Sequence, residues 1–511
     1  MLAHARRCSA TLGHTPHTQC TILHTIYLNG KSRRLSSTST IDTRTVLSKI
    51  QEFTTKHPVS IFRSRSVNPY HNLAIENYLL KRSEPKSRVL FTYTNRPCVV
   101  FGRNQNPWLE CNIAKVQEGL RWCTAEWTGN KSVEGFDSNS RQAVNELVPL
   151  DLVRRRSGGG TVIHDVGNLN FSFIVPNDKD FTRDNNAWLV VSVLKEYQRQ
   201  HHHHQQGSVK VLFDKIRVNE RHDIVMTRDL KDEVYQDTQE YKASGSAYKL
   251  TRGRALHHGT LLHSSPNVRQ PKEREFDANT FSTLLSSPGK PFLHAKGVGS
   301  VRSPVHNLFS VDSVNDRRNL VTALEDCLGS TFGSLHEDHN VPRVTVGDDD
   351  CQWDANIEIH DDVQEMLTND WRFCQTPSFE YESLHSEGQV KLHFEVKHGI
   401  IRSPKLHTRD DSLLGEDDLA DIDGKKLHEV RSWDSLLPES PAINSASIKA
   451  NLATTFPEIH LVKADSRIQF KDRILEEQDT SASSLGETAI KRKSRRGVVE
   501  VEKAGQNVIM E

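Results

Sequence analysis

The stretch that decides how this chain folds runs from residue 154 to residue 168 and reads RRRSGGGTVIHDVGN. Three arginines end a short apolar run, three glycines follow, and Val162 and Ile163 return to strand-like sequence. Because glycine has no Cβ atom, a ligand can lie directly against the backbone of such a turn. Its N–H groups can point at phosphate oxygens, and arginine matches phosphate geometry. The stretch therefore predicts an anion-binding turn between two strands, although a flexible turn beside a solvated basic patch would have the same composition.

Two common phosphate-binding motifs are excluded by the residues that follow the glycines. No Gly-Lys-Ser/Thr is present, so the turn is not a Walker loop. The sequence after the turn is typical of a strand and not of a helix, which excludes the dinucleotide fingerprint.

Short helices and strands are predicted on both sides of the turn, beginning near Val59. Helical spacing predicts a helix that ends at Lys81 and another around residues 112–118. Alternating or apolar runs predict strands at residues 88–93, 98–102, 150–153, 170–175, 210–218, 223–227 and 254–262. Two polar, unpatterned segments, residues 124–145 and 198–208, are predicted to be inserted loops.

Composition narrows the class of protein. At 511 residues the chain is long enough for two or three domains. A formal net charge of zero argues against a general binder of nucleic acids or anionic membranes, and no apolar run approaches the length of a membrane-spanning helix.

The eight cysteines never form Cys-x-x-Cys, which indicates single thiols in a reducing compartment. The run His201–His204 lies among glutamines and is interpreted as low complexity, so no metal site is predicted from protein ligands.

The N-terminal segment, residues 1–50, is predicted to be a mitochondrial presequence without fixed structure. No acidic residue precedes Asp42, and Arg6, Arg7 and Arg33 lie among serine, threonine and histidine. Such arginine-bearing, acid-poor sequence is typical of matrix targeting, although an ordinary disordered tail would have a similar composition.

A second informative stretch surrounds Lys242, within YKASGSAY at residues 241–248. The small residues allow a ligand or another backbone to approach, and one lysine stands at their edge. A lone lysine is normally a solvated surface charge. Together with a glycine-rich anion turn, however, it suits a site where a carboxylate meets a nucleotide phosphate.

Taken together, these stretches resemble the lipoate–protein ligase family, which shares a catalytic fold with biotin–protein ligases. The matching segments occur in the family's order between Val59 and Leu308. They are NP…NLAIE (68–76), GR…NPW…ECN (102–112), residues 154–168, KASGSAY (242–248), HHGTLL (257–262) and KGV…SVRSPV…NL (296–308).

The resemblance implies an α+β fold: a catalytic domain with mixed sheets flanked by helices at residues 57–347, and a small C-terminal α/β accessory domain. It also implies that lipoate, or octanoate, reacts with ATP and Mg²⁺ to give acyl-AMP. The acyl group then passes to a lysine on apo lipoyl domains, those of 2-oxoacid dehydrogenase E2 subunits and of the glycine cleavage H protein. No nucleic acid or membrane is expected as a partner, and a monomer is expected.

Carried over residue by residue, the resemblance assigns Lys242 to catalysis, with contacts to the acyl carboxyl and the adenylate phosphate. The residues expected to bind ATP or the adenylate are Arg155, Gly158, Gly159, Gly160, Thr161, Val162, Ile163 and Lys242. Further candidates are His164, Asp165, Asp223 and His258, although a hydrogen-bonded turn or strand packing would equally explain His164, Asp165 and His258.

Two residues depart from the family's pattern. His222 stands where the family usually has asparagine before an aspartate, here Asp223, which leaves the adenylation step open. Arg156 stands where a small polar residue is common.

The C-terminal part resembles the accessory domain of the full-length ligases. After a predicted linker at residues 348–350, helical spacing and two strands predict a small α/β domain at residues 354–463, interpreted as a lid that moves between the two steps. Residues 464–511 are polar and predicted to be a disordered tail.

Three functions therefore remain open. The first is a complete ATP-dependent ligase. The second is a transferase that moves lipoyl or octanoyl groups from preformed acyl-AMP or acyl-CoA. The third, of another class, is an inactive scaffold that binds lipoyl domains.

Overall fold

The computed structural model describes the chain between residues 43 and 460 with internal gaps. The described ranges are 43–122, 146–148, 150–201, 207–227, 239–268, 280–295, 297, 299–338, 340–351, 356–383, 390–408, 413–414, 419–437 and 446–460. The loop predicted at 124–145, most of the histidine run, the tail from residue 464 and nearly all of the expected presequence lie outside these ranges. Those predictions therefore stay predictions.

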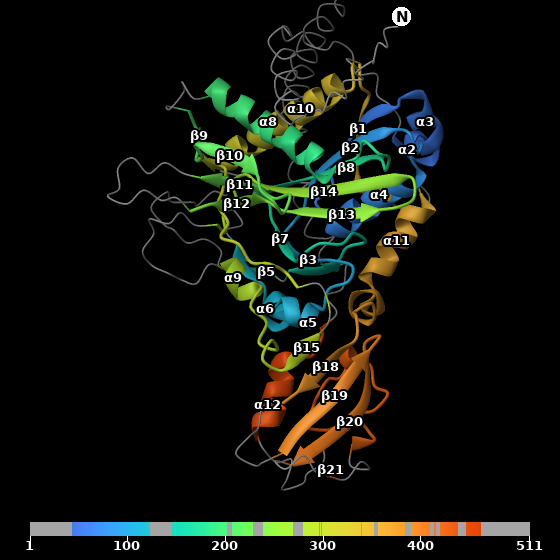
Figure 1. Cartoon of the computed structure of the whole chain (residues 1–511), viewed down its shortest axis with the longest axis vertical. Coiled ribbons are helices and arrows are strands. Elements are labelled where there is room, and N and C mark those ends of the chain that lie inside the picture. The colour runs from blue at the N-terminus through green and yellow to red at the C-terminus, as the bar shows by residue number, and fades with distance from the viewer. Residues whose placement is uncertain are drawn as a thin grey trace, which may run out of the picture. The chain divides into compact units, whose positions relative to one another are not determined.

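A six-stranded mixed sheet forms the centre of the fold (Figure 1). In spatial order its strands are β13 (Ser246–Leu250), β14 (Arg254–Leu262), β8 (Asn168–Pro176), β2 (Arg88–Thr94), β1 (Val59–Ser64) and β17 (Arg343–Val346). The pairs β1–β2 and β1–β17 are parallel, and the remaining three pairs are antiparallel. Every residue of β8 except Pro176 is buried, because helices cover both faces of the sheet.

Successive side chains of β2 point into two different cores, as the pleat of a strand requires. Phe91 packs with helix α4 (Pro69–Arg82), whereas Leu90 packs with α8 (Arg183–His201) and α10 (Val314–Leu335). Helix α4 begins where it does because the Asn68 side chain accepts the Tyr70 N–H and Pro69 occupies the first turn.

Two smaller sheets carry the stretches singled out in the sequence. In the first, β3 (Cys98–Phe101) pairs in parallel with β6 (Asp151–Arg154) and antiparallel with β7 (Val162–His164). In the second, β10 (Lys215–Val218), β11 (Ile224–Thr227) and β12 (Tyr241–Ser244) form an antiparallel sheet. The single strand predicted at 210–218 is two strands, because Phe213 is buried at a bend between them. The first of the two, β9 (Val209–Val211), pairs with β16 (Phe309–Val311).

The apolar core of the C-terminal sheet also contains Val99 and Phe101 of β3 and Trp108. The strands of this sheet, in order, are β15 (Leu293–Ala295), β18 (Phe379–Glu382), β19 (Val390–Lys397), β20 (Ile400–Thr408) and β21 (Leu413–Leu414). Alternate residues of β19 are buried, and Phe394 packs with Tyr381, Trp433 and Phe456. The remaining elements are α5 (Pro107–Glu110), α6 (Ile113–Glu118), β4 (Leu120–Trp122), β5 (Glu146–Val148), α9 (Thr280–Leu284) and α12 (Ala446–Thr455).

The described structure differs from the sequence prediction at its start. Helices α2 (Thr43–Ser48) and α3 (Ile50–Lys56) precede Val59, the predicted first folded residue. They belong to the fold because Val46, Leu47 and Ile50 are buried in the core that contains α4. The segment predicted to lack fixed structure up to residue 50 therefore includes ordered helix from Thr43.

Two other predicted boundaries also shift. Helix α8 continues to His201, whose ring stacks on Tyr197 at 4.0 Å, so residues 198–201 are helical and not loop. The residues predicted as a linker form a 3₁₀ helix, Asp348–Cys351, and the next helix, α11 (Ile357–Leu367), packs its buried face in the same core as α4. The described residues through Ile459 form one compact unit.

Within the described residues, none of the helices combines the length and the apolarity that crossing a bilayer requires.

Candidate functional site

The glycine turn, residues 157–161, connects β6 to β7 and is tightly confined. Gly159 has φ +93°, a conformation that favours glycine. A Cβ atom on Gly102 would lie 2.1 Å from the Gly159 carbonyl oxygen, so the neighbouring strand end also requires glycine. The residues expected to cradle a phosphate are therefore close-packed backbone.

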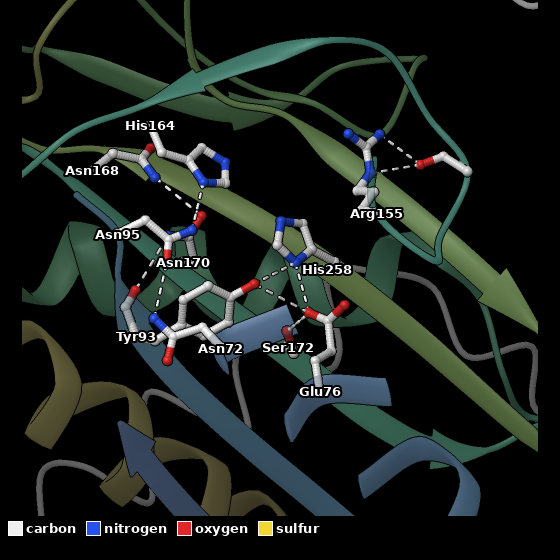
Figure 2. A network of polar contacts seen from close by, with 11 residues as sticks. Asn72, Glu76, Tyr93, Asn95, Arg155, His164, Asn168, Asn170, Ser172 and His258 are labelled. Atoms are coloured by element: carbon white, nitrogen blue, oxygen red, sulfur yellow. Dashed lines mark hydrogen bonds and ion pairs between the residues drawn. The ribbon is translucent and has the colours of Figure 1, made fainter. Parts of the chain in front are cut away.

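Arg155 holds the turn in this shape (Figure 2). Its Nε donates to the Gly158 carbonyl at 3.0 Å, and its Nη2 donates to the Gly158 and Gly160 carbonyls at 2.6 and 2.8 Å. Only 2% of the residue is exposed. Burial lowers the pKa of the guanidinium to about 10, which leaves it charged at neutral pH. Because a turn of glycines has no side chains to satisfy its own carbonyls, the guanidinium donates to them in this structure. The expected contact of Arg155 with a nucleotide stays a prediction.

The other two arginines are also engaged with the chain. The Arg154 guanidinium donates to the backbone carbonyls of Arg103, Gln105 and Arg372. Arg156 pairs with carboxylates of α11. The cationic run before the turn is thus structural in this conformation.

Two amides of the turn are satisfied by neighbouring segments. The Gly158 N–H donates to the Tyr248 carbonyl at 3.2 Å, and the Thr161 N–H donates to Ser300 Oγ at 2.8 Å. The amides of Gly159 and Gly160 donate to no group in the described part of the chain. An anion at the turn would therefore meet these two N–H groups.

Lys242 lies on β12, and its ammonium pairs with Asp223 Oδ2 at 2.9 Å. About a quarter of its side chain, 26%, is exposed. A Cβ atom on Gly245 would lie 3.4 Å from Nζ, so this glycine leaves room for the lysine. Asp223, a site candidate from the sequence, is the ion-pair partner of Lys242, and its side chain is 8% exposed.

The lysine and the glycine turn are joined through β13, which follows Lys242 after Gly245. Tyr248 accepts the Gly158 N–H, and Ala247 packs so closely that a Cβ on Gly159 would lie 3.0 Å from its Cβ. The structure therefore brings the lysine stretch against the turn, as the sequence predicted, with the ammonium itself directed at Asp223.

His222 has a conformation that explains the asparagine usually found at this position. Its φ is +63°, in the left-handed region that asparagine, aspartate and histidine tolerate better than most residues. Its Nδ1 lies 2.5 Å from Asp184 Oδ1, and its carbonyl accepts the Ser246 hydroxyl. His222 thus fits the backbone role of the expected asparagine.

Behind the turn lies a buried polar network (Figure 2). Glu76 Oε2 is 2.7 Å from His258 Nδ1 and also accepts the Ser172 hydroxyl, and Tyr93 Oη lies 3.2 Å from the same histidine nitrogen. Burial works to raise the pKa of Glu76, but the His258 charge and the hydrogen bonds from His258 and Ser172 outweigh it and lower that pKa. Glu76 is therefore an ionised carboxylate in the interior.

A second branch of the network contains His164. Asn72 donates to Asn95 at 2.8 Å, and the Asn95 amide lies 2.9 Å from His164 Nδ1. Burial, followed by the His258 and Arg155 charges, holds the pKa of His164 well below its usual value, so this ring is neutral. The Nε2 atoms of His164 and His258 are buried without a hydrogen-bond partner, which marks a place where a ligand or water can bind.

Asp165 is not part of this network. It accepts hydrogen bonds from the Gly167 amide, the Ser265 hydroxyl and the Asn267 amide. Its carboxylate shapes the turn before β8, which is the structural alternative considered for it.

The sequence analysis missed Glu76, Tyr93 and Asn72. A signal was present, since Glu76 is a charged residue among the apolar positions of a helix, and a buried charge requires a partner. Its partner is 182 residues away in sequence, and no local pattern reveals that distance.

One cluster offers side chains that metals favour, namely Asp370, Cys374 and His428. The Lys426 ammonium already lies 2.9 and 3.1 Å from the two Asp370 oxygens, and burial with the Asp370 charge raises the pKa of the Cys374 thiol to about 11. A neutral thiol beside an occupied carboxylate is a poor metal site, so an ion pair accounts for this cluster.

Comparison with known proteins assigns the family. The family model described as "Lipoyl protein ligase A/B catalytic domain" matches residues 68–323, half of the chain. This chain belongs to the lipoyl protein ligase A/B family. The resemblance drawn from the sequence is thereby confirmed, as is the mixed α+β fold of this lipoyl ligase.

Two relatives named as lipoate-protein ligases align with this chain over most of their own length. A putative lipoate-protein ligase A of Schizosaccharomyces pombe is 30% identical over 371 residues, 69% of this chain and 81% of the relative. A lipoate-protein ligase A of Psychrobacter cryohalolentis is 29% identical over 379 residues, 73% of this chain and 90% of the relative.

Two solved structures are also similar, at low identity. P. falciparum LipL1 in complex with lipoate is 19% identical, with a TM-score of 0.40, covering 82% of this chain and 99% of that chain. A lipoate-protein ligase A bound with ATP is 16% identical, with a TM-score of 0.33, covering 61% and 97%.

Proposed function

We propose that the chain is an ATP-dependent lipoate–protein ligase that works in two steps. A lipoate carboxylate oxygen attacks the α-phosphorus of ATP, the bond to the β-phosphate breaks, and pyrophosphate leaves. The ε-amine of an acceptor lysine then attacks the acyl carbon of lipoyl-AMP, loses a proton, and AMP leaves. The observation that carries the proposal is the partly exposed Lys242 ammonium on a segment that packs against the glycine turn.

Lys242 supplies the charge that the first step requires. Two anions, a carboxylate and a triphosphate, must approach each other, and negative charge develops on the α-phosphate oxygens. An ammonium held by Asp223 can exchange that partner for the carboxylate and the phosphate and so stabilise the transition state. The amides of Gly159 and Gly160 are free to donate to the same phosphate.

Mg²⁺ enters with ATP in this proposal. Asp223, beside Lys242, is already paired with that lysine and lies 3.5 Å from Arg221. Glu110, beside the glycine turn, already accepts hydrogen bonds from the Ser300 and Thr161 hydroxyls. Phosphate oxygens and water would therefore hold the ion, as is usual for Mg²⁺ with nucleotides.

The acceptors proposed are apo lipoyl domains of 2-oxoacid dehydrogenase E2 subunits and the glycine cleavage H protein, and the compartment proposed is the mitochondrial matrix. The absence of acidic residues before Asp42 supports the compartment. A reporter fused after residue 50 should enter mitochondria, and a diffuse cytosolic signal would exclude it.

One assay tests the reaction. The purified full chain is mixed with lipoate, MgATP and an apo lipoyl domain, and pyrophosphate and lipoylated domain are measured together. The ligase forms both in equal amounts. Transfer from synthetic lipoyl-AMP or from acyl-CoA without pyrophosphate release would identify a transferase. Binding of the domain without either product would identify a scaffold.

A further inference from the structure

Arginines beside the glycine turn contact the segment that leads from α11 into the C-terminal sheet. We call residues 369–376 the junction segment. It contains the π-helical turn Asp370–Cys374 and precedes β18. Its arginine partners are Arg103, Arg154 and Arg156.

Trp371 is the centre of this contact. The Arg156 guanidinium lies 3.6 Å from the centroid of its ring, and the Arg103 guanidinium lies 4.5 Å away. The indole Nε1 donates to the Arg154 carbonyl at 2.9 Å. Stacked cations and a buried indole hydrogen bond fix the ring to the strand that ends in the glycine turn.

Arg156 also binds α11. Its Nη2 lies 2.5 Å from both Asp362 Oδ1 and Glu365 Oε2. The side chains of Arg156 and Asp362 are only 13% and 11% exposed, so solvent screens this pair weakly. Asp362 accepts a further hydrogen bond from Asn77 of α4 at 3.0 Å. The arginine thus joins the turn, α11 and α4.

The charge balance excludes a simple phosphate-binding role for Arg156 in this conformation. Two carboxylates neutralise it, and an aromatic ring covers one face of its guanidinium. Any effect of Arg156 on nucleotide binding must therefore come from the way it positions the glycine turn. Arg156 directly precedes Ser157, whose carbonyl accepts the Arg103 N–H at 2.9 Å. The two arginines that stack on Trp371 therefore both meet the glycine turn at Ser157, its first residue.

We propose that Arg156 is a positioning residue that makes the glycine turn and the junction segment move as one body. Nucleotide binding at the turn is thereby coupled to the position of the C-terminal sheet. The nucleotide part rests on the proposed function, whereas the coupling of the two segments does not.

The test compares Arg156→Ser with Arg82→Ser in the full chain. Arg82 makes the same kind of pair with α11, to Glu358 at 2.7 Å, but it is half exposed and contacts neither Trp371 nor the turn. Amide hydrogen exchange is measured for residues 157–161 and 369–376, and pyrophosphate release gives KM for ATP and kcat.

We expect Arg156→Ser to speed exchange about 10-fold in both segments and to raise KM for ATP about 10-fold, with kcat changed less than about 3-fold. Arg156→Lys keeps the ion pair but loses planar stacking, so it should show an intermediate effect. Arg82→Ser should leave both segments and KM unchanged.

Faster exchange confined to residues 369–376, with KM unchanged, would overturn the proposal. Arg156 would then stabilise the junction segment alone. Equal effects of the two variants would also overturn it. If Arg156→Ser does not fold, Trp371→Leu replaces it, since leucine removes the ring on which the Arg156 guanidinium stacks. It must speed exchange in both segments for the proposal to stand. If the wild-type chain forms no pyrophosphate, the proposed function fails, and the exchange data still decide the coupling.

Discussion

The arginine run at residues 154–156 and the lone Lys242 carry the same kind of charge beside the same turn, yet they differ in what they can reach. Arg154 and Arg155 are no more than 2% exposed, and all three arginines bind carbonyls or carboxylates of the chain. Lys242 is 26% exposed and has one carboxylate partner. Nearness to glycines does not make a cation a phosphate ligand. The cation that keeps access to solvent is the one available for chemistry.

Replacing Arg155 should have the largest effect, and on stability. Arg155→Ala leaves the carbonyls of Gly158 and Gly160 unsatisfied and removes a charge that interacts with Glu76, so we expect the free energy of unfolding to fall by about 3 to 5 kcal/mol. Urea denaturation measures it. A variant that unfolds like wild type but binds ATP poorly would make Arg155 a nucleotide ligand and erase the contrast with Lys242.

The shape of the turn can be tested without touching a charge. Gly102→Ala places a Cβ 2.1 Å from the Gly159 carbonyl, so the backbone of the turn must shift. We expect a loss of about 1 to 3 kcal/mol in unfolding free energy together with weaker ATP binding. Gly253→Ala is the matched control, because its Cβ meets nothing within 4 Å. Equal behaviour of the two alanine variants would show that the turn is not confined.

Acid should destabilise the fold through buried histidines such as His257 and His263, whose pKa burial lowers to about 3. Below the ordinary histidine pKa near 6.5 the unfolded chain binds protons that the folded chain does not, so stability falls as pH falls from 6.5 towards 3. Each such histidine should contribute up to about 1.4 kcal/mol per pH unit. His263→Gln should reduce the slope of unfolding free energy against pH, and an unchanged slope would contradict this account.

The smallest effect is expected at the residue that departed from the family pattern. His222→Asn keeps a residue that tolerates φ of +63°, so unfolding free energy should change by less than about 0.5 kcal/mol and the ligation rate by less than about 3-fold. A large gain in rate would show that histidine had weakened adenylation.

Local patterns predicted the elements well where the pattern was long. The strand at residues 254–262, nine residues long, has the predicted bounds. Helix α2 was missed because Val46 and Leu47 are too few to form a pattern before the fold supplies their partners. The single strand predicted at 210–218 was wrong because residues 212–214, where Phe213 is buried, separate two strands that pair in different sheets.

The sequence predicted which residues belong to the site, but it did not predict which partners their side chains contact. The glycine turn, Lys242 and Asp223 were identified from composition and resemblance. The roles of the arginines depend on partners such as Arg372, 218 residues after Arg154, and Trp371. A chain that folds back over such separations leaves no local trace, so sequence alone could not distinguish a structural arginine from a phosphate ligand.

The central claim is that Lys242 carries the cationic chemistry of the site while the arginine run maintains its shape. The most direct test is Lys242→Ala, assayed for pyrophosphate release with lipoate and ATP and for urea unfolding on the same preparation. We predict a rate lower by about 10²-fold or more, with the unfolding free energy within about 1 kcal/mol of wild type. A near-normal rate in a folded variant would remove Lys242 from the mechanism and contradict the account.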